Sequence, residues 1–516
     1  MFRHPGIMKK KFNFQINLII VIFLSFVLSC EFAMHEKVSD IKKPNRPNIL
    51  LLMSDNQYAD HLGCYGDRSI KTTHIDKLAK EGVIFKNAYC SAPSCSPARA
   101  SMLTGKDIWN LGEAANLWSS FPKVKVYTKL MEESGYHVGI EGKGWGPGDE
   151  SVTGWKQNPG GVRYDSFEDF FNEVEKGQPW MYWYSSRDPH RPYRKEGLKK
   201  SGIHLDSINV PPYLPDNYEV RKDIADYYNE IQRFDEEVGS YISLLKEMGQ
   251  VENTIIIVCS DNGWQMPRGL ANLYDFGTKI PLIISWPEFF PPGREVDDFV
   301  NIKDFAPTFL EVSNIPVPKD MNAKSFLNIL TSKKQGRIDP KRDHVIMARE
   351  RHAFVRKGGL GYPGRAIRTA NYLYIKNYEP DRWPAGDPPL YGDVDAHMLH
   401  YESPTKLYML KNKEFKKVMP LFDLAFSKRP KEELYDLLND PFQMNNVANV
   451  DKYKPNLETM SNRLKSYLVK TQDPRELNQK FNWDNAPYYK DRDKKPRPSK
   501  KAREMLGLKE EYSYLN

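Results

Sequence analysis

The chain has 516 residues, of which 40% are hydrophobic and 28% are charged. This composition predicts a globular protein with a large core and excludes a mainly disordered chain. The formal net charge is +8, but Arg3 and the lysines at 9–11 lie in the N-terminal leader and leave only +4 to the remaining chain. A charge this mild does not indicate a nucleic-acid partner.

Residues 1–29 have the composition of a targeting segment. After the lysines at 9–11, residues 18–28 form an apolar run that is too short for a comfortable membrane span. The run ends in Val-Leu-Ser-Cys, which resembles a bacterial lipoprotein signal with Cys30 lipidated as the first mature residue. An ordinary secretory signal with a chance cysteine is the alternative. We therefore expect an exported lipoprotein that is anchored in a membrane and faces the periplasm or cell surface, with residues 30–46 as a tether.

The body of the chain alternates strand-like and helix-like segments. Continuous apolar runs such as residues 48–53 are typical of buried parallel strands. The alternation predicts an α/β domain at residues 47–344, with a large, mostly parallel sheet flanked by helices. Strands are expected at residues 48–53, 137–140, 180–184, 254–258 and 281–285, and helices at 75–82, 126–134, 167–176, 220–248 and 304–313.

The sequence pattern changes near residue 345. Aromatic and β-forming residues cluster at 372–375, and a helical pattern occupies residues 457–469. We expect a smaller antiparallel α+β subdomain at residues 345–475. The basic, proline-containing tail predicts a surface arm at residues 476–516.

Residues 93–105 read as a loop that enters a helix. Ser96 can cap this helix, Pro97 suits its first position and the glycine at 105 can end it. Cys95 would then lie at the helix N-terminus, where free amide groups and the helix dipole favour an anion. Arg99 follows one turn later on the same face. A nucleophile, a positive helix end and a guanidinium together suit attack on a phosphate-like or sulfate-like centre.

Two of the predicted strands are each followed by an Asp-Asn pair. The first leads into Asp55 and Asn56, and the fourth leads into Asp261 and Asn262. In open parallel sheets, ligands bind beyond the carboxyl ends of the strands. Carboxylate and amide oxygens suit a hard cation such as Ca²⁺ or Mg²⁺. A turn or a helix cap is the alternative for each pair taken alone.

The pattern Cys-x-Pro-x-Arg at Cys95 and Arg99, continued as Ala-Ser-Met-Leu-Thr-Gly, resembles the signature of type I sulfatases. The resemblance implies an alkaline phosphatase-like fold. It also implies that Cys95 is oxidised to formylglycine (3-oxoalanine) by a formylglycine-generating enzyme, or maturase. The metal positions of the family, which hold one Ca²⁺ ion, fall on Asp55, Asn56, Cys95, Asp261 and Asn262.

Further motifs extend the resemblance. Lys143, in Glu-Gly-Lys, matches the family lysine that contacts the nucleophile and sulfate. His190, in Asp-Pro-His-Arg, lies in an element seen in the sulfamidase (N-sulfoglucosamine sulfohydrolase) branch, and residues 272–274 also resemble that branch. The catalytic candidates are therefore Cys95, Arg99, Lys143 and His190. We assign His190 as the acid for the leaving atom, with a structural histidine as the alternative.

The sequence departs from the family pattern at three positions. Trp145 follows the Gly-Lys element, where the family often has a histidine nearby, and Leu270 stands where a lysine or arginine is usual. Arg268 or Lys279 could substitute for that missing cation. Asn56 replaces a usual aspartate, which removes one negative charge from the metal site.

Four residues of the second half could recognise a sugar: Arg351, His352, Arg382 and Trp383. Arginine and tryptophan together can bind an acidic sugar, and an Arg-Trp turn that only packs is the alternative. The resemblance implies hydrolysis of sulfate esters on polysaccharide-derived oligosaccharides, for example of algal ulvan or carrageenan, with N-sulfated glucosamine as the runner-up. The open alternatives are a phosphomonoester or phosphonate hydrolase of the same superfamily, a thiolate enzyme, and a non-catalytic glycan-binding lipoprotein.

Overall fold

The structure is a computed structural model that describes residue 1 and residues 46–194, 197–393, 403–481, 483–489 and 500–509. The predicted signal peptide, Cys30 and nearly all of the tether lie outside the described residues. Residues 46–516 form one compact unit. Within the described part, no helix is both long and apolar enough to span a membrane.

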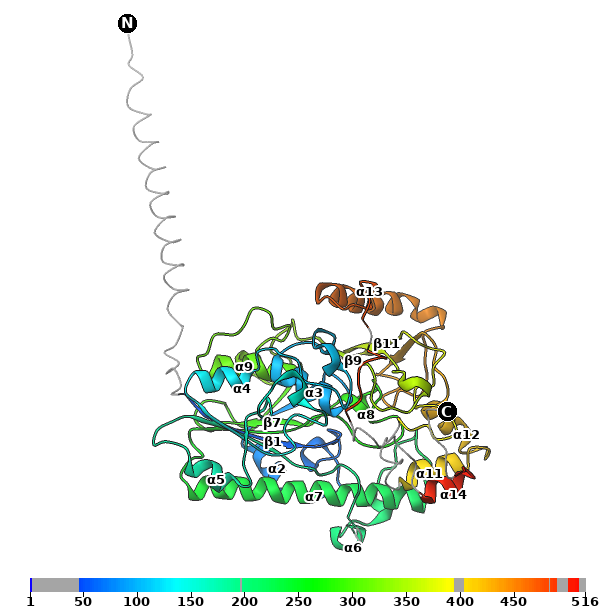
Figure 1. The fold of residues 1–516 in the computed structure, drawn as a ribbon, viewed down its shortest axis with the longest axis horizontal. Helices are drawn as coiled ribbons and strands as arrows, with labels where there is room; N and C mark the ends of the chain where they lie inside the picture. The colour runs from blue at the N-terminus through cyan, green and yellow to red at the C-terminus, as the bar shows by residue number, and fades with distance from the viewer. Residues whose placement is uncertain (2–45, 195–196, 394–402, 482, 490–499, 510–516) are drawn as a thin grey trace. The chain divides into compact units, whose positions relative to one another are not determined.

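An eight-stranded sheet forms the centre of this unit, in the order β4-β3-β5-β1-β6-β7-β2-β8 (Figure 1). All of its paired strands are parallel except β7, which runs antiparallel to both of its neighbours. The five predicted strands of this domain are confirmed. The strands are β1 (Asn48–Ser54), β2 (Val83–Tyr89), β3 (His137–Gly142), β4 (Val162–Arg163), β5 (Trp180–Ser185), β6 (Thr254–Ser260), β7 (Leu282–Ser285) and β8 (Arg294–Asn301).

The direction of β7 and the presence of β8 were not evident from the sequence. A parallel strand after β6 would need a crossover back to the opposite edge of the sheet. The connection contains only the short helix α8 (Asp275–Thr278), and β7 therefore runs back from the edge where β6 ends. Strand β8 lies at the sheet edge and alternates buried and exposed residues in its first half, so it lacks the continuous apolar run of a central strand.

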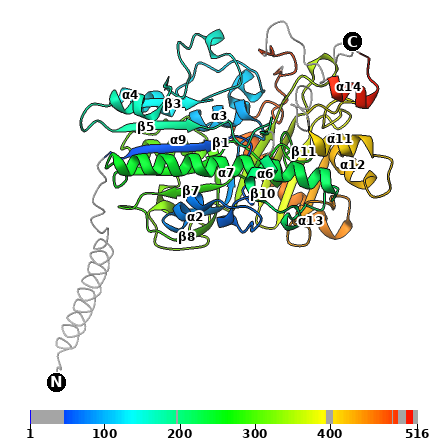
Figure 2. The ribbon, with the colours of Figure 1, turned by 90° about the horizontal axis from the view of Figure 1, so that it is seen from below.

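Helices cover both faces of the sheet. On β1, Leu50 and Leu52 face one helical layer, and Ile49 and Leu51 face the other, as the two-residue period of a strand requires. Figures 1 and 2 show the long helix α7 running along the first face. That layer contains α2 (Thr73–Lys80), α5 (Phe167–Asn172) and α7 (Tyr218–Glu247), and the opposite layer contains α3 (Cys95–Thr104), α4 (Tyr127–Glu133) and α9 (Phe305–Val312).

A second sheet of four antiparallel strands, in the order β12-β11-β10-β9, confirms the smaller α+β portion. The predicted late helix is α13 (Lys454–Lys470), which packs on this sheet. The strands are β9 (His344–Arg349), β10 (Gly364–Thr369), β11 (Tyr372–Asn377) and β12 (Glu432–Asp436). The remaining helices are α6 (Gly197–Ser201), α10 (Leu327–Leu330), α11 (Pro404–Lys411), α12 (Met419–Phe426) and α14 (Lys500–Leu506).

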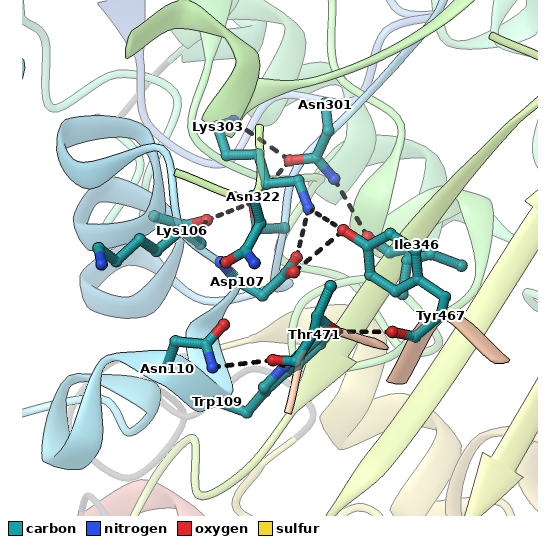
Figure 3. Close-up of polar contacts among 12 residues, drawn as sticks. Lys106, Asp107, Trp109, Asn110, Asn301, Lys303, Asn322, Ile346, Tyr467 and Thr471 are labelled. Atoms are coloured by element: carbon teal, nitrogen blue, oxygen red, sulfur yellow. Dashed lines mark hydrogen bonds and ion pairs between the residues drawn. The ribbon is translucent and has the colours of Figure 1, made fainter. Parts of the chain in front are cut away.

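A buried polar network joins the two portions (Figure 3). Asp107, in the loop after α3, forms an ion pair with Lys303. Tyr467 of α13 accepts a hydrogen bond from Lys303 Nζ at 2.8 Å and donates one to Asp107 Oδ2 at 3.0 Å. Nearby, the Trp109 indole donates to the Thr471 carbonyl at 3.2 Å. Helix α13 is therefore tied to the segment that follows α3.

Lys303→Met is expected to destabilise the fold by about 3–5 kcal/mol, because it leaves the buried carboxylate of Asp107 without its cation. Urea unfolding measures this change. Lys106→Met is the matched control, since the ion pair of Lys106 with Asp320 is largely exposed on the aspartate side and should contribute less than about 1 kcal/mol. Equal losses in the two variants would contradict a special role for the buried pair.

Candidate active site

Helix α3 begins at Cys95, two residues earlier than a cap at Ser96 predicted. Ser94 occupies the N-cap position in an extended conformation, and its side chain makes no capping bond to the helix. Its hydroxyl instead lies 2.8 Å from His352 Nδ1. Gly105 ends the helix with a left-handed φ of 64°, as predicted. Cys95 therefore lies in the first turn, where amide N–H groups are unpaired.

The two predicted oxygen-rich strand ends meet at Cys95. Strands β1 and β6 pair in parallel with Ser54 beside Ser260, so the residues that follow both strands leave the sheet together. The Cys95 Sγ lies 3.4 Å from Asp55 Oδ1 and 3.9 Å from Asn56 Oδ1. Ligand atoms of Asp55, Cys95 and Asp261 all lie within 4.8 Å of one another.

This donor set fits a hard divalent cation. Asp55, Asn56 and Asp261 supply buried oxygens at one point, which is the chemistry that such ions prefer. The buried Oδ1 of Asn262 has no hydrogen-bond partner among the described residues, although its amide nitrogen lies 3.8 Å from the Cys95 sulfur. An unpaired buried amide oxygen is costly unless a further group binds it.

Two cations lie against these carboxylates. Arg99 Nε donates to Asp261 Oδ2 at 2.8 Å, and Lys143 Nζ donates to Asp55 Oδ2 at 2.6 Å. Ser185 accepts from Arg99 Nη1 at 2.5 Å and was not predicted from the sequence. The Nη2 of Arg99 has no hydrogen-bond partner within the described residues. It can therefore bind an anion without losing an existing hydrogen bond.

The local charges decide which groups are ionised. Burial raises the pKa of Asp55, but Lys143, His190 and Arg99 outweigh it and hold that pKa well below its usual range. Burial, together with Asp261 and Asp55, raises the pKa of the Cys95 thiol well above its usual value. These surroundings stabilise a carboxylate ligand and disfavour a thiolate nucleophile, which argues against the alternative of a thiolate enzyme.

The cluster opens into a cavity of about 870 Å³. Cys95, Lys143, His190 and His352 all line it. Burial lowers the pKa of both histidines, that of His352 to about 4, so both imidazoles are mainly neutral at pH 7. The long helix α7 contributes three charged wall residues that sequence reasoning missed, Glu230, Arg233 and Glu237. Their spacing of three and four residues, on one helix face, was the available signal.

Comparison with known proteins decides the family. A model described as sulfatase matches residues 47–315, more than half of the chain, and one described as N-sulphoglucosamine sulphohydrolase, C-terminal, matches residues 268–387. The chain belongs to the sulfatase family. It is therefore a sulfuric ester hydrolase, with the alkaline phosphatase-like fold of that family.

Individual relatives agree with this assignment. An ulvan-active sulfatase of Formosa agariphila is 26% identical over 493 residues, covering 86% of this chain and 78% of that protein. The N-sulphoglucosamine sulphohydrolase of Homo sapiens is 28% identical over 478 residues, covering 83% of this chain and 91% of that protein. A structure solved in complex with its substrate D-glucosamine-2-N,6-O-disulfate has a TM-score of 0.59 at 18% identity, covering 83% of this chain and 99% of that one.

Most of the predicted sugar-binding residues of this sulfatase lie away from the cavity. His352 lines it. Arg351 donates to the carbonyls of residues 484, 486 and 487, and Arg382 forms an ion pair with Asp484 at 2.9 Å. Trp383 packs against Tyr391. Arg382 and Trp383 thus follow the packing alternative, because Asp484 and Tyr391 already engage their side chains.

The two proposed substitutes for the missing cation are also engaged elsewhere. Arg268 is buried, and its guanidinium donates to the carbonyls of Leu424 and Gln443. Lys279 forms an ion pair with Asp60 at 2.7 Å. Neither residue is on the described cavity wall, whereas Leu270 is. This geometry argues against either side chain taking the place of the lysine or arginine that the family usually has at the position of Leu270.

Trp145 fills a core position in this sulfatase. Its side chain is buried, and its indole donates to the Ser96 carbonyl at 3.1 Å. It therefore supports the first turn of α3 and offers no acid or base to the cavity. Among the described wall residues, His190 and His352 are the histidines.

Proposed function

We propose that this sulfatase is exported and removes sulfate esters from oligosaccharides derived from algal polysaccharides such as ulvan or carrageenan. The main support is the meeting of Cys95, Asp55 and Asp261 with Arg99 and Lys143 beside one large cavity. The similarity to an ulvan-active sulfatase favours this substrate class. Export and anchoring through Cys30 rest on the leader sequence alone.

We further propose that Cys95 is converted to formylglycine by a maturase and that Ca²⁺ binds beside it. A hydrated formylglycine supplies a hydroxyl nucleophile for attack on sulfur, and a bound calcium ion neutralises charge on the sulfate oxygens. The ligands would be Asp55, Asn56, Asp261, Asn262 and residue 95. Ligand atoms of Asp55, Cys95 and Asp261 lie within 4.8 Å of one another, and Asn56 Oδ1 lies 3.9 Å from the Cys95 sulfur, which supports this ligand set.

Each remaining residue has a role that follows from its position. The Nη2 of Arg99, which lies 3.8 Å from Asp55 Oδ2 and has no hydrogen-bond partner among the described residues, and the ammonium of Lys143 orient the sulfate and hold its charge. His190 lines the cavity close enough to Asp55 and Lys143 for their charges to affect its pKa. We assign it the transfer of a proton to the leaving oxygen or nitrogen, a role that requires the imidazolium, which is the minor form at pH 7 because burial lowers the pKa of His190.

N-Sulfoglucosamine is a second candidate substrate, because the C-terminal match and the Homo sapiens relative both carry the name of that activity. The test is ion chromatography of free sulfate after incubation with ulvan and carrageenan oligosaccharides and with N-sulfoglucosamine, using protein coexpressed with a maturase. Release from the algal oligosaccharides alone is the expected result. Faster turnover of aryl phosphate than of aryl sulfate would favour the phosphoester alternative, and binding without release would favour a non-catalytic glycan-binding protein.

A further inference from the structure

Among the described residues, the cavity wall carries five cationic side chains, and three of them are paired. Lys143 contacts Asp55 at 2.6 Å, and Arg191 forms two hydrogen bonds of 2.8 Å with Asp223. Arg233 contacts Asp188 at 2.8 Å and Glu230 at 2.7 Å. Each of these three cations therefore already has a carboxylate partner within the protein. The five wall cations are Lys143, Arg187, Arg191, Arg194 and Arg233.

The other two, Arg187 and Arg194, are exposed, and neither forms an ion pair with any described residue. Two further wall carboxylates, Glu141 and Glu237, form no ion pair with either arginine; Glu141 accepts from tyrosine hydroxyls and Glu237 accepts from a serine hydroxyl. Arg187 and Arg194 bracket the Asp-Pro-His-Arg turn that carries His190. The unpaired positive charge of the cavity therefore lies beside the catalytic turn.

We propose that Arg187 and Arg194 form a second anion subsite, which binds a carboxylate or a further sulfate of the sugar whose scissile sulfate lies at residue 95. The inference rests on the proposed function and makes the substrate class narrower: an oligosaccharide with at least two anionic groups. Guanidinium groups bind carboxylate and sulfate-like oxyanions in a bidentate manner. Leu270 adds no cation to the cavity wall, and the other three wall cations already have carboxylate partners, so recognition of a second anion depends on this pair.

The test compares the parent enzyme with the double variant Arg187→Ala/Arg194→Ala. The probes are glucosamine 2-N,6-O-disulfate and a monosulfated disaccharide that contains a uronic acid, each at low and high NaCl. We expect KM to rise by about 5- to 20-fold with kcat changed less than about 2-fold, and the salt dependence of KM to weaken. The probe that shows the rise identifies the second group as sulfate or carboxylate.

Two controls accompany this variant. Arg187→Lys/Arg194→Lys keeps both charges and should recover part of the lost affinity and the salt dependence. Lys417→Ala removes an exposed lysine that lies off the cavity wall, and it should leave KM unchanged. If the loss of surface charge in general raised KM, Lys417→Ala would also raise it, and that result would contradict the subsite.

Binding is also measured by calorimetry on a Cys95→Ser background, which does not depend on turnover. Unchanged affinity and salt dependence after loss of both arginines, or no binding of either probe, would overturn the subsite. Weaker binding in the double variant together with no sulfate release by the parent enzyme would reject the proposed function while the subsite stands.

Discussion

Cys95→Ala is expected to lower sulfate release by on the order of 10⁴-fold or more, because it removes the side chain from which the nucleophile is made. The fold should change by no more than about 1 kcal/mol, since a small side chain is shortened by one atom. Free sulfate by ion chromatography and the urea midpoint measure the two effects.

Cys90→Ala is the matched control for this change. Cys90 is also buried, and its sulfur lies 3.7 Å from the Gly277 carbonyl, outside the cluster at residue 95. The Cys90→Ala variant should retain sulfatase activity. Peptide mass at residue 95 separates a thiol from an aldehyde in the parent enzyme. Full activity in the Cys95→Ala variant would rule out a nucleophile made from residue 95.

Asp261→Asn is expected to lower kcat/KM by about 10²- to 10³-fold and to abolish stabilisation by calcium. The Asp261 carboxylate accepts two hydrogen bonds: Oδ2 accepts from Arg99 Nε at 2.8 Å, and Oδ1 accepts from the backbone N–H of Asn56 at 3.1 Å. An amide of the same shape lacks the charge that would hold both Arg99 and a cation. The melting temperature with and without CaCl₂ gives a readout that does not depend on turnover.

Asp60→Asn is the control for this second change, because Asp60 also pairs with a cation, Lys279, but lies off the cavity wall. Its variant should keep the calcium-dependent rise in melting temperature. A rise of equal size in the Asp261 variant would mean that the cation binds elsewhere.

Local sequence patterns were enough to predict the central strands and helices. The apolar run of β1 and the amphipathic pattern of α7 are properties of a few neighbouring residues, and both elements appear where they were expected. The polar residues after β1 and β6 could be placed together in advance, because parallel strands end at one edge of the sheet. The metal-binding candidates were therefore accessible from sequence.

The residues that line the cavity could not be predicted from local sequence patterns. Arg351, Arg382 and Arg268 carry the right charge for an anionic sugar, yet each guanidinium is used by backbone carbonyls or by an aspartate distant in sequence. Arg187 and Arg194 look no different in sequence, but tertiary packing leaves them without an ion-pair partner among the described residues of the cavity wall. Only the folded chain shows which charges are already neutralised.

The sequence by itself determined the place of Cys95 at the start of a helix, the paired oxygen donors after two strands, and the order of the main elements. Each depends on contacts between near neighbours or on the direction of parallel strands. The tertiary structure decided the reversed direction of β7, the core position of Trp145 and which cations of the described cavity wall lack an ion-pair partner. Those features depend on how segments far apart in the sequence share buried space and compensate each other's charge.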